Sequence, residues 1–130
     1  MKEKSENISS SISFEDFKNQ ILADYKTIVL SRECSYLGRK EVLSGKAKFG
    51  IFGDGKELPQ VAMSHFFEKG DFRSGYYRDQ TLLFAQENLT PEQLFAALYA
   101  DLDLTREPMS GGRQMGAHFN TPFLNKDGSW

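Results

Sequence analysis

The sequence predicts a mostly helical chain, and three observations indicate this class. Apolar residues recur at spacings of three, four and seven over a long segment at 13–44. A helix-capping signal stands at 90–93, and the 130 residues contain no βαβ alternation of strands and helices. We therefore expect helices over residues 13–104, a disordered polar tail over 1–12 and a Gly-rich loop over 105–130.

The first expected helix begins at Ser13, whose hydroxyl can cap it, with the acidic Glu15 in its first turn. Neither glycine nor proline interrupts it before Gly38, and it could continue to Gly45 with Ser44 near its C-cap. At 1.5 Å per residue, about 30 residues span roughly 45 Å, whereas a compact chain of this length has a radius of gyration of about 14 Å. So long a helix would overhang the rest. We expect it either to break near Gly38 or to pack on material that this chain does not contain.

Three shorter helices are expected further along the chain. A proline that suits a first helical turn and the apolar spacing after it predict a helix over 58–69. A short extended segment over 72–77 leads into a second helical pattern over 79–86. The third helix has the clearest start, because Thr90, a proline at N1 and a glutamine at N3 form a capping box, and its apolar positions continue to Leu102.

Residues 105–130 carry no periodic pattern and are punctuated by glycine and proline. A structureless stretch of this length is uncommon in a finished domain unless it is a binding loop or a linker. We therefore expect this chain to be the helical front part of a larger protein, ending in a truncated loop.

The composition excludes several classes of function. With 39% hydrophobic and 13% aromatic residues the chain is globular, and sixteen basic against eighteen acidic side chains give a net charge of −2. No general cationic surface for nucleic acid is therefore available. No apolar run approaches the roughly 18 residues of a membrane span, so we expect a cytoplasmic protein without a membrane partner. Cys34 is the only cysteine, which rules out an internal disulfide and a cysteine-cluster metal site.

Two local motifs bear on anion and metal binding. Residues 39–56 have a net charge of +3, which is either an ordinary solvated surface or an anion site. The charged residues of this segment are Arg39, Lys40, Lys46, Glu41, Lys48, Asp54 and Lys56. The string Gly53-Asp54-Gly55 could hold magnesium, but Asn88 follows too late for the motif, so we interpret the string as a turn and assign no metal site.

Four strings carry a resemblance to a known family. They are Ser31-Arg32-Glu33 with Gly45-Lys46, then Gly55-Lys56-Glu57 with Gln60-Val61-Ala62, then Tyr76-Tyr77-Arg78-Asp79, and finally Gly112-Arg113-Gln114-Met115 with His118. Their order and spacing resemble the N-terminal part of the α subunit of thiamine-diphosphate-dependent 2-oxo acid dehydrogenases, the E1 component. The last string resembles the branched-chain, or 2-oxoisovalerate, members most. Lys56 and Pro59 depart from the family pattern, and Gln80 replaces its usual histidine.

The resemblance implies an α/β class, with this chain as the mostly helical N-terminal portion of a thiamine-diphosphate-binding fold that lacks the later sheet strands. The implied activity is oxidative decarboxylation of a branched-chain 2-oxo acid, as in 3-methyl-2-oxobutanoate dehydrogenase, with acyl transfer to lipoyl-E2 in a multienzyme complex. The implied partners are an E1 β subunit or fused β-like half and the lipoyl-bearing E2 acyltransferase, within an oligomeric full-length enzyme. The cofactors would be thiamine diphosphate and Mg²⁺, whose metal ligands lie beyond this fragment, so the 130 residues alone are expected to be inactive.

The resemblance also implies roles for individual residues. The cofactor-binding residues would be Tyr77 and Arg78, which hold the diphosphate, and His118. The substrate-binding residues would be Phe49, which lines the acyl pocket, together with Tyr76 and Met115. No catalytic residue is assigned within the chain, because the family's catalytic glutamate belongs to the β subunit.

Two alternatives remain open at this point. One is the pyruvate or acetoin dehydrogenase E1 α subunit, which shares the same fold and cofactor. The other is a non-catalytic helical interaction module, whose long helix packs on a partner and in which the third and fourth strings are incidental.

Overall fold

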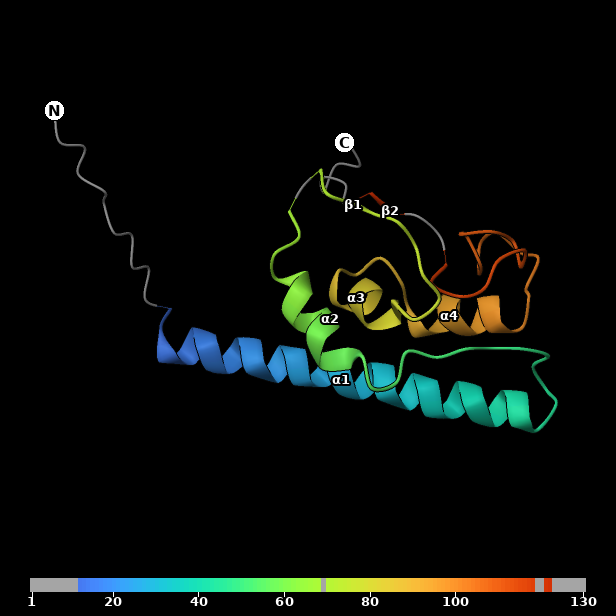
Figure 1. Ribbon diagram of the computed structural model, residues 1–130, viewed down its shortest axis with the longest axis horizontal. Helices are drawn as coiled ribbons and strands as arrows, with labels where there is room; N and C mark the ends of the chain where they lie inside the picture. Colours follow the sequence, from blue (N-terminus) through green and yellow to red (C-terminus); the bar gives the residue numbers. More distant parts are fainter. Residues whose placement is uncertain (1–11, 69, 119–120, 123–130) are drawn as a thin grey trace, which may run out of the picture.

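The computed structural model describes residues 12–68, 70–118 and 121–122, and Figure 1 shows a long helix with the other elements packed along part of its length. About half of the described residues are helical and almost none are in strands. The elements are α1 (Phe14–Leu43), α2 (Glu57–Ser64), β1 (Phe72–Arg73), α3 (Gln80–Ala85), α4 (Pro91–Leu98) and β2 (Thr121–Pro122). The two strands pair antiparallel, with Phe72 opposite Pro122. The expected helical content is confirmed, whereas the described residues contain no larger sheet that would mark an α/β fold.

Helix α1 is one continuous helix of 30 residues, so of the two alternatives for it the break near Gly38 does not occur. The Ser13 hydroxyl accepts a hydrogen bond from the main-chain N–H of Asp16, which confirms the predicted start. The helix ends with Ser44 as its C-cap, and Gly45 follows with a φ of +77°, a conformation that glycine adopts without a steric penalty. The buried residues of α1 all lie in its second half. They are Ser31, Cys34, Ser35, Gly38 and Glu41.

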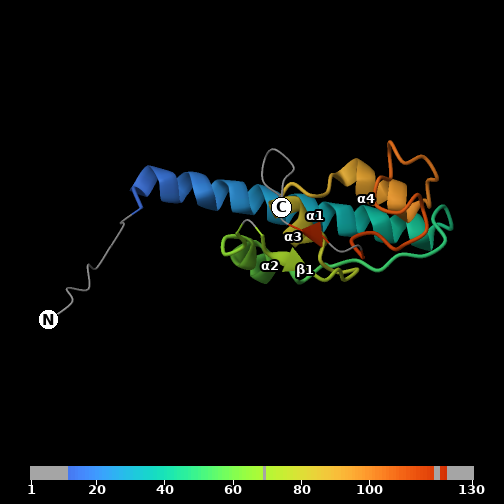
Figure 2. The ribbon, with the colours of Figure 1, turned by 90° about the horizontal axis from the view of Figure 1, so that it is seen from above.

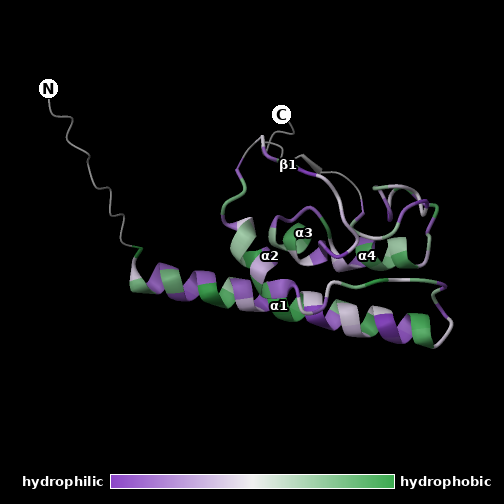
Figure 3. Cartoon of the chain, in the orientation of Figure 1, coloured by the Kyte–Doolittle hydropathy of each residue, from purple (hydrophilic) through white to green (hydrophobic). Residues whose placement is uncertain are grey.

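Much of the first half of α1 projects beyond the rest of the described chain, as Figures 1 and 2 show from two directions, while Gln20 and Asp24 within it contact His65 at 3.0–3.4 Å. We call residues 14–30 of α1 the overhang. Figure 3 shows apolar and polar residues alternating along it, and Phe14 is 79% and Tyr25 64% exposed. Other exposed apolar residues of the overhang are Phe17, Ile21, Leu22, Val29 and Leu30. The helix therefore overhangs its neighbours as its length predicts, and no helix in the described residues is long and apolar enough to cross a membrane.

A small apolar core lies where α3 and the segments around α4 meet the second half of α1. Leu83 is fully buried there, and burial raises the pKa of the Cys34 thiol. The cluster consists of Cys34, Leu83, Phe84, Leu89, Leu94 and Ala117, with Phe95 and Met109 packed against it. Cys34 therefore serves as a small apolar residue in the core.

Polar side chains fill the contact between α1 and α3. The Gln80 amide donates to the Ser31 carbonyl, the Ser31 hydroxyl and the Ser35 hydroxyl at 2.9–3.1 Å. The Ser31 and Thr81 hydroxyls share a further hydrogen bond of 2.6 Å. Because these groups are buried and hydrogen-bonded, they fix the start of α3 against α1. Gln80, which stands where the resembled family has histidine, therefore links α3 to α1 in this chain.

The short helices begin close to where the sequence predicts but end earlier. The capping box of α4 is present, with the Thr90 hydroxyl accepting from Gln93 N–H and the Gln93 amide oxygen accepting from Thr90 N–H. That helix ends at Leu98 because Ala100 takes a φ of +55°, so the expected extension to residue 102 is wrong. Similarly, α2 ends at Ser64, five residues before the predicted end. Of the expected tail at 1–12, only residue 12 lies inside the described residues.

Candidate functional site

The segment at residues 49–53 forms a wall that is held close to two other parts of the chain. The Phe52 ring lies directly against Gly38 of α1, so that a Cβ at Gly38 would overlap the ring. At Gly53 a Cβ would lie 2.5 Å from the main-chain oxygen of Arg78. Glycine at these two positions therefore lets the wall segment approach α1 and the turn before α3. A cavity lies on each side of the wall segment.

The first cavity is an apolar pocket between the wall segment and α4. Phe49 and Met115, two of the predicted substrate-binding residues, both line it. Leu94 and Leu98 of α4 complete its apolar surface. Phe49 is 60% exposed, so the pocket opens to solvent on that side. The structure thus brings together two residues that are 66 positions apart in the sequence.

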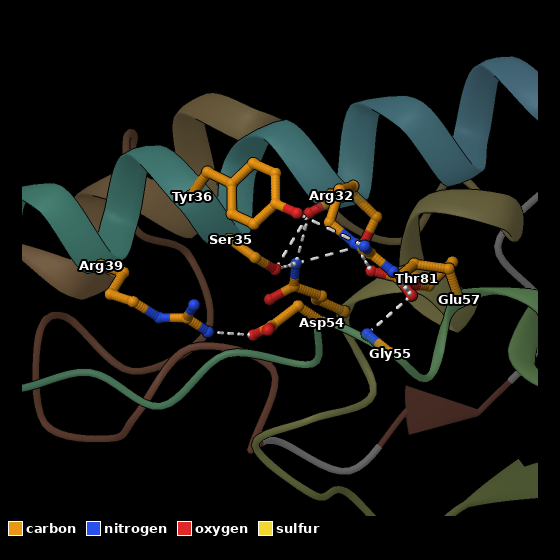
Figure 4. Close-up of polar contacts among 10 residues, drawn as sticks. Arg32, Ser35, Tyr36, Arg39, Asp54, Gly55, Glu57 and Thr81 are labelled. Carbon is orange, nitrogen blue, oxygen red and sulfur yellow. Dashed lines mark hydrogen bonds and ion pairs between the residues drawn. The ribbon is translucent and has the colours of Figure 1, made fainter.

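The second cavity is a groove on the other side of the wall segment, and we call it the cationic groove. It is lined by Arg39 of α1, by Asp54, by Arg78 and by the apolar residues Val42, Leu43, Gly50, Ile51 and Phe52. Arg39 Nη2 donates to Asp54 Oδ1 at 2.5 Å, a contact that Figure 4 shows. No carboxylate of the described residues pairs with Arg78. A groove with two guanidinium groups and one carboxylate favours an anion.

The remaining predicted site residues form a cluster around Tyr77. The Tyr76 hydroxyl donates to the Tyr77 hydroxyl at 2.7 Å, and this hydrogen bond raises the pKa of Tyr76. The Arg78 guanidinium lies 5.6 Å from the centre of the Tyr77 ring, and the His118 ring centre lies 6.1 Å from it. His118 N–H in turn donates to the Met115 carbonyl at 3.1 Å. One short turn therefore connects the Tyr77 cluster with the apolar pocket.

An ion pair joins the first two strings of the resemblance. Arg32 Nε and Nη2 donate to the two carboxylate oxygens of Glu57 at 2.6 and 2.8 Å, as Figure 4 shows. Gly55 N–H also donates to this carboxylate at 2.8 Å. Hydrogen bonding to Arg32 holds the pKa of Glu57 below its usual range, although burial opposes the shift. The pair fixes the start of α2 on α1 and thereby the turn that carries Asp54.

Arg73 of β1 joins the third and fourth strings. Its Nη1 donates to Asp79 Oδ2 at 2.8 Å, and Nη1 and Nη2 both donate to the Ala117 carbonyl at 3.3 Å. Burial lowers the pKa of Arg73, while the Asp79 carboxylate opposes that shift. Arg73 thus places the turn of Tyr77 and Arg78 next to the segment that ends in His118. Its spacing in the sequence gives no signal of this role.

Glu107 organises the loop before the fourth string, and sequence reasoning missed it. Its carboxylate is fully buried and accepts hydrogen bonds from the main-chain N–H groups of Met109, Ser110 and Gly112 at 2.8–3.2 Å, and from the Ser110 hydroxyl. Burial raises the pKa of Glu107, but these hydrogen bonds outweigh it and the net shift is downward. Residues 105–118 contain neither helix nor strand, as expected of a loop, and the Glu107 carboxylate gives this loop its turns. The sequence signal that could have indicated this loop is a glutamate placed shortly before a serine and two glycines.

The Gly53-Asp54-Gly55 string forms the predicted turn, with Lys56 N–H donating to the Gly53 carbonyl at 3.0 Å. The Asp54 carboxylate is engaged by Arg39. Within residues 12–68, 70–118 and 121–122, no group of three or more histidine, cysteine, aspartate or glutamate side chains could hold a metal ion. Asp54 therefore lines the cationic groove as the ion-pair partner of Arg39.

Comparison with known proteins identifies no relative. The chain matches no protein-family model, no curated protein and no solved structure. A proposal of function therefore has to start from the four strings and from the geometry and chemistry of the described residues.

Proposed function

We propose that this chain is the N-terminal part of an E1 α-type subunit of a thiamine-diphosphate-dependent 2-oxo acid dehydrogenase, of the branched-chain type. One observation carries the proposal. Arg78 of the third family-like string and Met115 of the fourth line cavities on the two sides of the wall segment at 49–53, a cationic groove and an apolar pocket. An enzyme of this class needs both surfaces, because its cofactor is a diphosphate and its substrate has an aliphatic body.

Arg78 and Tyr77 are suited to hold a diphosphate. Arg78 lines the groove, is exposed and has no carboxylate partner among the described residues, so its planar donors are available to phosphate oxygens. Tyr77 lies under the same guanidinium and keeps it in place through its ring. His118 stands beside Tyr77 at the edge of this surface. When bound, thiamine diphosphate supplies the electron sink for decarboxylation, and the protein supplies position and electrostatics.

Phe49 and Met115 are suited to hold an aliphatic acyl group. Both line the apolar pocket, where burial of each additional methylene of a substrate contributes about 1 to 3 kcal/mol. The enzyme should therefore prefer branched 2-oxo acids over pyruvate, and equal specificity constants for the two would favour the pyruvate or acetoin dehydrogenase alternative. Tyr76 would contact the substrate from the Tyr77 side.

The proposal also assigns partners. The overhang of α1 would pack on the E1 β subunit or on a fused β-like half, and the full-length oligomer would act in the cytoplasm. The remaining sheet strands of the α/β fold and the Mg²⁺ ligands would belong to the rest of that enzyme. A lipoyl-bearing E2 acyltransferase would accept the acyl group.

Calorimetric titration of the chain with thiamine diphosphate and Mg²⁺, in parallel with thiamine, tests the proposal. We expect binding that requires the diphosphate, and Arg78→Ala should weaken it about tenfold or more because a charge-assisted donor is lost. Lys40→Ala is the matched control, since it removes an exposed cation of α1 that does not line the groove. Equal binding of thiamine and thiamine diphosphate, or no binding of either, would contradict the proposal.

The exposed overhang favours a second candidate, a non-catalytic helical interaction module. In that case a partner would bind along residues 14–30 of α1, and substitutions in the cationic groove would leave binding unchanged. The same titration separates the two candidates, because a pure interaction module has no reason to distinguish thiamine diphosphate from thiamine.

A further inference from the structure

We infer that Arg39 is a second anion-binding side chain of the cationic groove. The Asp54 carboxylate pairs with the Arg39 guanidinium group that a phosphate or diphosphate would otherwise bind. Only the identification of the ligand as a diphosphate rests on the proposed function. The inference assigns a role to a residue of α1 that none of the four family-like strings contains.

Arg39 and Arg78 approach one groove from different elements. Arg39 lies on the second half of α1, whereas Arg78 lies on the turn before α3. The close approach of Gly53 to the Arg78 carbonyl brings Asp54, the next residue, to the same groove. The groove is therefore lined by two arginines that come from separate elements.

Arg39 is accessible and mostly uncommitted. Its side chain is 48% exposed, and its one hydrogen bond among the described residues is the contact from Nη2 to Asp54. A guanidinium group has five N–H donors, so most of them remain for a ligand. An ion pair with this much solvent exposure stabilises little, and a polyanion with several acceptor oxygens can displace the single carboxylate.

The other cations of residues 39–56 do not share this position. Lys46 pairs with Glu41, and neither Lys40, Lys48 nor Lys56 lines the cationic groove. Of the five basic residues in this fully described segment, Arg39 is the one that lines the groove. The basic segment thus contributes one specific donor to an anion site, and its four lysines are exposed outside the groove.

Asp54 sets the affinity of the groove by competing with the ligand. With Arg39 and Arg78 charged and Asp54 ionised, the three side chains carry a net charge of +1. Replacing Asp54 with asparagine raises this to +2 and frees the Arg39 fork. The Asp54 carboxylate therefore weakens anion binding, the opposite of its expected effect if it were a magnesium ligand.

Calorimetric titration with inorganic pyrophosphate, without metal, tests the inference on the full 130-residue chain. We expect Arg39→Ala to weaken pyrophosphate binding about tenfold or more, Arg39→Lys to recover part of it, and Asp54→Asn to strengthen it about threefold or more. Lys40→Ala, one position along the same helix, should change it less than twofold. Circular dichroism should show the same helical content in all variants, because Arg39 is exposed and alanine is the better helix former.

Three results would overturn the inference: unchanged binding in Arg39→Ala, weaker binding in Asp54→Asn, or an equal loss in Lys40→Ala. Thiamine diphosphate is the second arm. If pyrophosphate binding depends on Arg39 but thiamine diphosphate binds no tighter than pyrophosphate, the anion site stands and the proposed function fails. If thiamine diphosphate binds through Arg78 while Arg39→Ala has no effect, the proposed function stands and the role of Arg39 is refuted.

Discussion

The Phe52 ring lies directly on Gly38, near the C-terminal end of the longest helix in the described residues. This contact explains why a helix of 30 residues contains a glycine at a buried position, where glycine costs about 1 kcal/mol relative to alanine. The missing side chain makes room for the ring. Because Phe52 lines both the apolar pocket and the cationic groove, the contact with Gly38 sets the shape of both.

The first prediction follows from this contact. Gly38→Ala gains about 1 kcal/mol of helix propensity, but the added Cβ overlaps the Phe52 ring, and overpacking costs about 1 to 3 kcal/mol. We expect a net loss of up to about 2 kcal/mol in the free energy of unfolding, measured by urea denaturation. Adding Phe52→Leu to Gly38→Ala should recover part of the loss. A more stable Gly38→Ala variant would show that the ring moves aside freely.

The second prediction concerns the asymmetry of the ion pair between Arg32 and Glu57. Arg32 is 38% exposed at its side chain, whereas Glu57 is only 3% exposed. Arg32→Met leaves a buried carboxylate without its cation, while Glu57→Gln leaves a guanidinium group that still reaches water. We therefore expect Arg32→Met to destabilise the chain more than Glu57→Gln in urea denaturation at pH 7. The reverse order, or a double mutant whose loss equals the sum of the two single losses, would contradict the pairing.

The third prediction concerns acid pH and Glu107. A carboxyl group whose pKa is lowered on folding stabilises the native state above its unfolded pKa of about 4.3, and this contribution is lost as the pH falls through the folded pKa. Glu107→Gln should cost roughly 2 to 4 kcal/mol at pH 7, because buried hydrogen bonds to a charged acceptor are weakened. Its stability should also fall less steeply below pH 4.3 than that of the wild type.

Glu33→Gln is the control for this prediction, since it makes the same chemical change at an exposed position of α1. Its stability and acid response should follow those of the wild type. An equal acid response in wild type and Glu107→Gln would remove Glu107 from the acid-sensitive groups.

Local signals predicted the helix starts, and contacts between distant residues determined the rest. Ser13 and Thr90 mark the starts of α1 and α4 because a cap depends on the next three residues only. The helix ends were predicted less well. Helix α4 stops just before Ala100, which has a positive φ, although alanine favours helices and therefore gives no signal of a helix end. The ion pair of Arg32 with Glu57 spans 25 positions, and no local pattern identifies it.

The candidate site, too, could be predicted from the sequence only in part. The resemblance selected six residues, and the structure places Phe49 with Met115 in one pocket and Tyr76, Arg78 and His118 around Tyr77. The groove residue Arg39 could be recognised only as one cation among five in a basic segment. Its selection depends on the path of the wall segment, which brings Asp54 and the turn before α3 to the same groove.

The fourth prediction concerns the overhang of α1. Its exposed apolar side chains should make the isolated chain self-associate at micromolar concentration and unfold over a broad range. Phe17→Glu combined with Ile21→Glu should lower the weight-average mass in sedimentation equilibrium, with Asn19→Glu as a control on the same helix. A wild-type chain that is monomeric and melts in a sharp two-state transition would contradict this expectation.

The most direct test of the proposed site is an amide ¹H–¹⁵N NMR titration of the chain with thiamine diphosphate and, separately, with thiamine. We expect thiamine diphosphate to shift the signals of Arg39 and Arg78 in the cationic groove, of Tyr77 beside Arg78 and of Met115 at the apolar pocket, in one saturating process. Thiamine, which lacks the diphosphate, should leave the groove signals unchanged. Shifts that are confined to the overhang of α1, or groove signals that respond equally to both compounds, would contradict a thiamine-diphosphate site formed by the segments around residues 49–53.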